Sequence, residues 1–171
     1  NVNVVASIFY KETEDAIDFT RTQAEETSSS AFIARNYGDN VTKGFDIEFD
    51  ASSFASMHLG LDLLKLTHTR LIQTIETDLA VLKNTDGQLE NQSALQSGFS
   101  FYNNYSLSST YKYESRFNSD DYELLDVRLA YQDDNLTVAL SGTNLLDEEY
   151  VDGGFVEVAG PAVMLEVGYE L

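Results

Sequence analysis

The sequence contains no cysteine and a single proline, Pro161. The lack of cysteine excludes a disulfide framework and a thiolate metal site. No run of about 20 apolar residues is present, so no transmembrane helix is predicted. Basic residues are few, 10 against 29 acidic ones, and the net charge is −19. Because binding to nucleic-acid phosphates requires lysine and arginine, we expect no nucleic-acid partner.

Patterns that indicate catalysis or metal binding are also missing. The two histidines, His58 and His68, have no neighbouring ligand residues in the sequence. No spacing of a nucleophile, a base and an orienting acid appears, and no glycine-rich phosphate loop. The acidic clusters lack the spacing of a calcium loop. The sequence therefore predicts a protein that is not an enzyme and that holds neither a metal ion nor a cofactor.

What the sequence does contain is period-two alternation of apolar and polar residues, the pattern of half-buried strands. The last segment is the clearest, since its odd positions from Val163 to Leu171 are all apolar and its even positions include Glu166 and Glu170. Seven further segments alternate similarly: 2–10, 45–49, 57–63, 95–101, 105–114, 125–131 and 136–141. We expect an all-β protein of about eight strands.

The connections between these segments alternate in length. Short links are expected at 51–56, 102–104 and 132–135, and long polar links at 12–40, 67–91, 116–121 and 147–160. Short turns at one end and long loops at the other are typical of a bacterial outer-membrane barrel. The leucine-rich stretches 61–66 and 71–82 are read as strand extensions beyond the membrane.

The tyrosines support the same interpretation, because they gather near the ends of the segments. Aromatic girdles at both interfaces are typical of membrane barrels. We therefore predict an antiparallel up-and-down transmembrane β-barrel, with its apolar face toward outer-membrane lipid and its polar face toward the lumen. The girdle residues expected are Tyr10, Tyr102, Tyr105, Tyr113, Tyr122, Tyr131, Tyr150 and Tyr169.

Four segments resemble the barrel strands of TonB-dependent outer-membrane receptors. The most specific is Asn144-Leu145-Leu146-Asp147-Glu148-Glu149-Tyr150, which is similar to a signature of the penultimate strand. Segments 160–171, 43–48 and 122–129 resemble the last strand, a recurrent G-F-D-x-E strand and the strand before the penultimate one. The chain departs from the family pattern in ending on Leu171, where an aromatic residue is usual.

This resemblance implies a receptor of about 22 strands around a plugged lumen. Residues 1–171 would then be the C-terminal part of the barrel, with the plug domain and the earlier strands absent. It further implies the outer membrane of a Gram-negative bacterium, a TonB partner reached through the missing N-terminal plug region, and a small nutrient ligand, most commonly an iron–siderophore complex. In the expected external loops, Tyr37 and Phe155 are the candidate ligand contacts, with packing between loops as the alternative.

Two other readings remain open from the sequence. One is a complete eight-stranded outer-membrane protein, an adhesin or a narrow pore, in which the first and last strands pair. The other is a soluble lipocalin-like ligand-binding barrel whose apolar face points inward. The sorting of short and long links argues against the soluble barrel, and the penultimate-strand signature argues against the small membrane protein. Within that signature, Asn144 and Asp147 are expected to form a turn.

Overall fold

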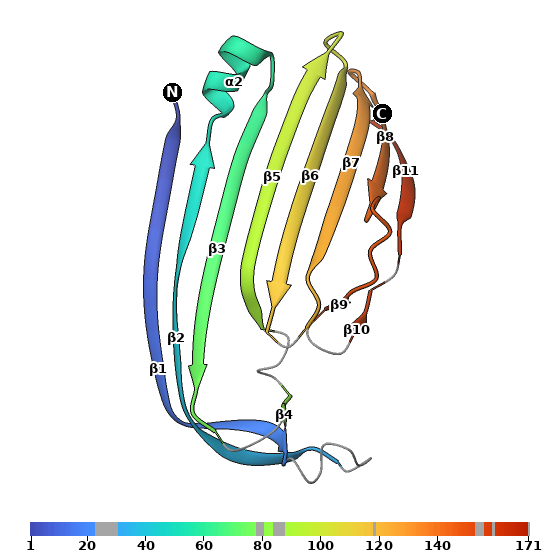
Figure 1. Ribbon diagram of the computed structural model, residues 1–171. Coiled ribbons are helices and arrows are strands. Elements are labelled where there is room, and N and C mark those ends of the chain that lie inside the picture. The colour runs from blue at the N-terminus through green and yellow to red at the C-terminus, as the bar shows by residue number, and fades with distance from the viewer. Residues whose placement is uncertain are drawn as a thin grey trace.

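The computed structural model describes residues 1–22, 31–77, 81–83, 88–117, 119–152, 156–158 and 160–170. In these ranges a single antiparallel sheet runs in the order β11-β8-β7-β6-β5-β3-β2-β1-β4 (Figure 1). The sheet is open, since β1 and β11 do not pair with each other. Eight of its strands are long: β1 (Asn3–Arg21), β2 (Ile33–Asp50), β3 (Leu63–Ile75), β5 (Leu89–Phe101), β6 (Tyr105–Arg116), β7 (Tyr122–Gln132), β8 (Leu136–Thr143) and β11 (Ala162–Tyr169).

The remaining elements are short. Strand β4 (Val81–Leu82) pairs with the far end of β1, and β9 (Val151–Asp152) pairs with β10 (Val156–Glu157) in a separate hairpin. A helix, α2 (Ser52–Leu59), lies between β2 and β3. No helix of the described ranges is long and apolar enough to cross a membrane.

Strand register gathers the alternating residues into two faces. One row of partners runs across five strands through Phe99, Leu107, Leu129, Leu140 and Leu165. We call the face with this row the apolar face, and the opposite face, which carries Glu48, Glu114, Asp126, Arg128 and Glu166, the polar face. From Leu107 to Leu165 the four leucines of the row are 36% to 66% exposed. The predicted alternation is confirmed, and the described residues leave the large apolar side chains of this row exposed.

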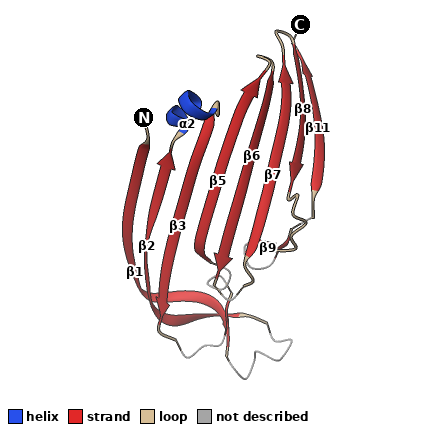
Figure 2. Ribbon diagram, turned by 45° about the horizontal axis from the view of Figure 1, so that its top comes forward, coloured by secondary structure: helices blue, strands red, loops and turns tan. Residues whose placement is uncertain are grey.

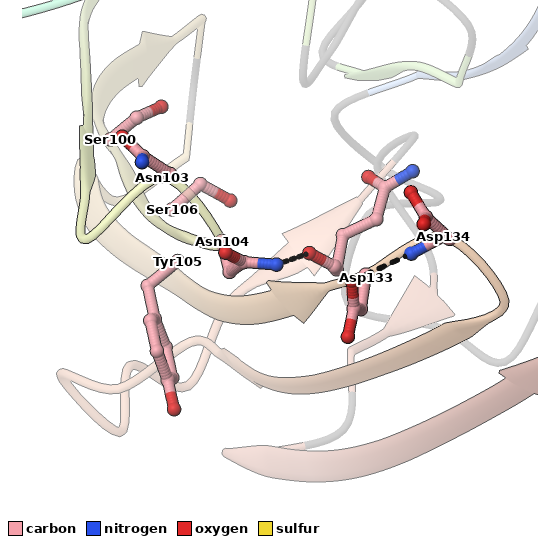
Figure 3. Close-up of a pocket in the computed structure, with 8 residues that line it drawn as sticks. Ser100, Asn103, Asn104, Tyr105, Ser106, Asp133 and Asp134 are labelled. Atoms are coloured by element: carbon pink, nitrogen blue, oxygen red, sulfur yellow. Dashed lines mark hydrogen bonds between the residues drawn. The ribbon is translucent and has the colours of Figure 1, made fainter.

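The tight turns predicted at 102–104 and 132–135 are confirmed, and hydrogen bonds join them to each other. The Asn104 side-chain amide donates to the Gln132 carbonyl at 2.8 Å, and the Gln132 amide donates to the Asn104 carbonyl at 2.8 Å. Both turns border a polar hollow of about 460 Å³ in which Asp133 also bonds the Asp134 amide (Figure 3). Since the polar groups of this hollow satisfy one another, we assign it to turn formation.

At this short-turn end the aromatic girdle is confirmed in part. The Tyr105 ring lies 5.4 Å from the Phe101 ring and 5.0 Å from the Tyr131 ring, all on the apolar face. The expectation is wrong for Tyr122, because an even position on β7 belongs to the polar face, and Tyr122 is buried there. The prediction is also wrong for Tyr150, whose ring stacks on the Tyr122 ring with 4.2 Å between the centroids.

The prediction of a strand at 57–63 is wrong. Residues 52–59 form α2, which ends at Gly60 with a left-handed φ of 69°, and β3 begins only at Leu63. The prediction rested on apolar residues at alternate positions, but such residues also fit a short helix. In this helix only Ala55 is buried. The helix therefore replaces a short turn, at the same end as the tight turns and both termini (Figure 2).

Two of the four long links, those predicted at 12–40 and 67–91, are shorter than predicted. Strand β1 continues to Arg21, β2 starts at Ile33, β3 continues to Ile75, and β5 starts at Leu89. Most of these extensions have little apolar alternation, and backbone pairing requires none. At 17–20 apolar and polar residues do alternate, but a stretch of this length is too short to distinguish from a polar link. The stretch 71–82 is a strand extension as far as Ile75, and its last two residues form β4.

Beyond residue 13 the hairpin of β1 and β2 bends away from the sheet. A double register shift lies between Thr13 and Ile17, where Asp15 has a φ of 50° and Gly38 a φ of 100°. A Cβ atom on Gly38 would lie 2.6 Å from the Glu76 carbonyl oxygen, so only glycine fits this bend. We call residues 16–21 and 33–38 the arm; it runs across the long-loop end of the sheet (Figure 1).

Gly44 allows β2 to pack closely between its neighbours. A Cβ atom there would lie 2.1 Å from the Arg70 carbonyl oxygen and 2.7 Å from the Phe9 ring. We predict that Gly44→Ala lowers the free energy of unfolding by about 1–3 kcal/mol, because the backbone of β3 must shift. Gly168→Ala is the matched control, since its nearest contact would be an ordinary 3.8 Å. Urea unfolding of both variants checks this, and equal losses would contradict it.

Candidate functional site

The arm encloses a small apolar cluster at the long-loop end. Ala16, Tyr37 and Leu82 are at most 8% exposed, and Ile75 packs against them. Strand β4 holds the arm from its other side, where Thr20 pairs with Leu82. Tyr37 therefore lies in β2 and not in the external loop that the sequence predicted, and its side chain belongs to this cluster.

Tyr37 also borders a cavity of about 290 Å³ under the arm. Lys11, Thr13 and Asn40 lie on the polar face by register, so the arm bends toward that face. Gln88, the residue before β5, also lines the cavity. We call this the arm cavity, and its lining residues are Lys11, Thr13, Ala16, Ile17, Asp18, Tyr37, Asn40 and Gln88.

Polar groups of both kinds line the arm cavity. The Asn40 side-chain amide donates to the Tyr37 hydroxyl oxygen at 3.3 Å, which leaves the tyrosine proton available for donation. The Asn40 Oδ1 atom is buried and has no hydrogen-bond partner in the described ranges. Lys11 adds an ammonium group, and Asp18 a buried carboxylate. This set of donors and acceptors suits an organic molecule with hydroxyl and carbonyl groups.

Of the two candidates from the sequence, the structure places only Tyr37, because Phe155 lies outside the described residues. Sequence reasoning missed Lys11 and Asn40. Both fall near predicted strand ends, and only the bend after Thr13 brings them under the arm.

A second polar cluster lies on the polar face near the long-loop end of β6. Glu114 is 2% exposed and accepts hydrogen bonds from Gln92 at 2.5 Å, from the Tyr122 hydroxyl and from Arg116 at 2.8 Å. Lys112 adds an ion pair at 2.9 Å. One carboxylate therefore joins β5, β6 and β7 and forms ion pairs with two cations.

This cluster holds Glu114 in its ionised form. The apolar residues of β6 end at Tyr113, so Glu114 lies beyond the apolar part of the strand. Burial by itself raises the pKa of Glu114, but hydrogen bonds from Tyr122 and Lys112 outweigh burial and lower it to about 2. Burial and the bond to Glu114 also raise the pKa of Tyr122, which therefore stays a donor.

The signature segment connects this cluster to the last long loop. The Asn144 side chain accepts from the Glu148 amide at 3.1 Å and donates to the Glu148 carbonyl at 2.9 Å. Asn144 and Asp147 have positive φ values of 50° and 58°, so the predicted turn is confirmed. The turn carries Tyr150 onto the ring of Tyr122, whose hydroxyl donates to Glu114. The signature residues thus build a turn and anchor the loop.

Metal ligands do not gather in the described part of the chain, where no three His, Asp or Glu residues form a group able to hold a metal ion. His68 bonds Ser93 at 2.8 Å on the apolar face, and the His58 ring packs at a tilt against Phe54 in α2. The two histidines lie on different elements and have separate partners.

Comparison with known proteins agrees with this architecture. The family model described as "TonB dependent receptor-like, beta-barrel" matches residues 1–145. No curated protein matches the sequence.

Solved structures of similar fold include the copper transporter OprC, with a TM-score of 0.71 and 14% identity. The FrpB iron transporter of Neisseria meningitidis has a TM-score of 0.67 and 16% identity. The ferripyoverdine receptor of Pseudomonas aeruginosa, bound to ferripyoverdine, has a TM-score of 0.65 and 14% identity. Each similarity covers 98% of this chain but only 29%, 28% and 25% of the respective neighbour. At such identities the likeness shows the fold, and the chain spans under a third of these proteins.

Proposed function

Because this chain belongs to the TonB-dependent receptors, we propose that it forms the C-terminal wall of an outer-membrane transporter that takes up an iron–siderophore complex. The proposal places a plug domain and further strands in the same polypeptide ahead of residue 1. The transported complex passes through the lumen, and TonB acts on the plug. Members of the family and the structural neighbours are receptors and transporters, which supports the expectation that no reaction is catalysed.

The observation that carries the proposal is the uncovered apolar face and its slope across the sheet. On β11 the apolar side chains run from Val163 to Tyr169, and on β1 from Val2 to Tyr10. Strand register puts these two stretches at different heights. Val4 of β1 is level with Leu125 of β7, whereas Leu165 of β11 is level with Leu129 of β7. Along β7, position 125 lies four residues nearer the long-loop end than position 129.

The apolar band is therefore inclined to the rows of paired residues that run across the sheet. Strands that are tilted in a flat membrane require this inclination. We infer that the apolar face contacts lipid and that the polar face lines the lumen. The long loops and the arm then lie at the cell exterior, and α2 and the tight turns lie in the periplasm.

The two alternatives from the sequence have less support. In the small eight-stranded protein β1 would pair with β11, whereas the sheet is open between them. In the lipocalin-like barrel the apolar side chains would be packed inside, whereas Leu140 and Leu165 are 48% and 66% exposed.

The function is tested with the full-length receptor expressed in a bacterium that lacks its own siderophore receptors. A panel of siderophores loaded with radiolabelled iron, including ferripyoverdine, is supplied to the cells. We expect accumulation of at least one complex, and loss of that accumulation when TonB is deleted. Uptake that persists without TonB, or no uptake of any complex, would overturn the proposal.

We assign the arm cavity to the organic part of the transported complex. Tyr37→Phe keeps the packed ring and removes the hydroxyl, so we predict about fivefold weaker binding of the transported complex, the equivalent of one hydrogen bond worth about 1 kcal/mol. Tyr111→Phe is the matched control, since Tyr111 lies on the apolar face. Binding of the iron complex to the purified receptor is followed by fluorescence. The assignment fails if the two variants weaken binding equally, or if neither does.

A further inference from the structure

The apolar face carries two cations in the described ranges, Lys43 on β2 and Arg70 on β3. Register pairs Lys43 with Ile72 and Phe45 with Arg70, so the two cations are diagonal neighbours on adjacent strands. Diagonal neighbours of a sheet lie about 7–8 Å apart, within reach of one shared ligand for long side chains. The other described cations lie on the polar face, on the arm or in loops.

Both cations lie at the same border of the apolar band. Along β2, Phe49, Ile47 and Phe45 precede Lys43 toward the long-loop end. Along β3, Leu64 and Leu66 lead through His68 to Arg70. Ile72 follows Arg70 on the same face and is level with Lys43. With the orientation proposed above, this border is the level of the outer-leaflet headgroups.

Polar contacts on the apolar face hold Arg70 in place. Its Nη1 atom donates to Asn91 at 2.6 Å, and Asn91 donates to Ser115 at 2.7 Å, across β3, β5 and β6. The rest of the guanidinium has no partner among the described residues. Such a chain would be costly in hydrocarbon, whereas it is well placed at a polar interface.

No carboxylate of the described residues forms an ion pair with Lys43 or Arg70. Glu12 is the acidic residue of this face nearest to Lys43, one diagonal step away on β1. It accepts a hydrogen bond from the Tyr10 hydroxyl at 3.2 Å and makes no ion pair with Lys43. By contrast, Lys65, Lys112 and Arg128 on the polar face all pair with glutamates.

We propose that Lys43 and Arg70 form a binding site for the phosphate of a lipid headgroup in the outer leaflet. The site rests on the lipid-facing orientation of the proposed function. A fixed guanidinium beside a mobile ammonium suits a phosphate, which accepts several hydrogen bonds. The site is continuous with the apolar band, and this favours a lipid as its ligand. With the phosphate bound at the two cations, the acyl chains would lie on Phe45 and Ile47.

The test uses the full-length receptor in nanodiscs with bisphosphorylated lipid A or with its dephosphorylated form. Native mass spectrometry counts the lipid that stays bound. We expect a preference for the phosphorylated form that falls about fivefold for each cation removed, in Lys43→Gln and in Lys43→Gln/Arg70→Gln. Lys65→Gln/Arg128→Gln removes the same charge from the polar face and should retain the preference.

Several outcomes would overturn the site. These are an equal loss in the polar-face control, an unchanged preference in Lys43→Gln, and displacement of the lipid by inorganic phosphate at equal concentration. Lys43→Gln breaks no hydrogen bond of the fold, so its result does not depend on the Arg70–Asn91 contact. Uptake of the iron complex should be unchanged in Lys43→Gln, so failure of this site and failure of the transport proposal are separate results.

Discussion

Leu165→Lys is expected to reduce the amount of folded receptor in outer membranes severalfold, whereas Met164→Lys leaves it near the wild-type level. The two residues are neighbours on β11 and are 66% and 59% exposed, so size and exposure are matched. They differ in face, because Leu165 pairs with Leu140 on the apolar face and Met164 pairs with Ser141 on the polar face. The pair therefore tests which face contacts lipid.

The magnitude follows from the cost of an ammonium group in hydrocarbon. Leu165 lies in the middle of the apolar stretch of β11, where lysine on the lipid side of a barrel costs about 2–4 kcal/mol. On the polar face Met164→Lys places its charge beside Glu166, where water and carboxylates accept it. Folding is measured by heat-modifiable electrophoretic mobility in membrane fractions. The reverse order of the two variants would mean that the polar face contacts lipid.

Glu114→Gln is expected to lower the free energy of unfolding of the receptor by about 3 kcal/mol, because it leaves Lys112 and Arg116 close together without a carboxylate. Glu166→Gln is the control. It removes the 3.2 Å ion pair between Glu166 and Arg128, whose side chains are 51% and 41% exposed, respectively. Exposed ion pairs contribute about 0–1 kcal/mol to stability. Urea unfolding in detergent, followed by circular dichroism, measures both.

Acid should reduce the difference between wild type and Glu114→Gln. The pKa of Glu114 is lowered in the folded state, so its stabilisation is fully present above the unfolded value of 4.5 and is lost as pH falls through about 2. The difference in stability should therefore be constant from pH 7 to about 5 and shrink toward pH 2. A difference that does not depend on pH would show that ionised Glu114 is not the source.

Local alternation was enough to predict most strands, because a strand with one apolar and one polar face reports its own period. It failed at 57–63, where alternate apolar residues fit a helix equally well. It also failed at 12–21 and 33–40, where apolar alternation is absent or, as at 17–20, only four residues long. Tyr122 was placed with the girdle because tyrosine suits both an interface and a buried hydrogen bond. Only its register on β7, opposite Glu114, decides between them.

By itself the sequence determined the class of the protein, the two-faced strands, the tight turns and the turn at Asn144, since these depend on neighbours along the chain. The tertiary structure decided the features that depend on register and on bends. It brought Lys11 and Asn40 into one cavity with Tyr37 of the arm, because a double register shift and a positive φ at Gly38 redirect the hairpin. It also placed Lys43 diagonal to Arg70 across two strands, since register, and not sequence distance, sets which side chains meet in a sheet.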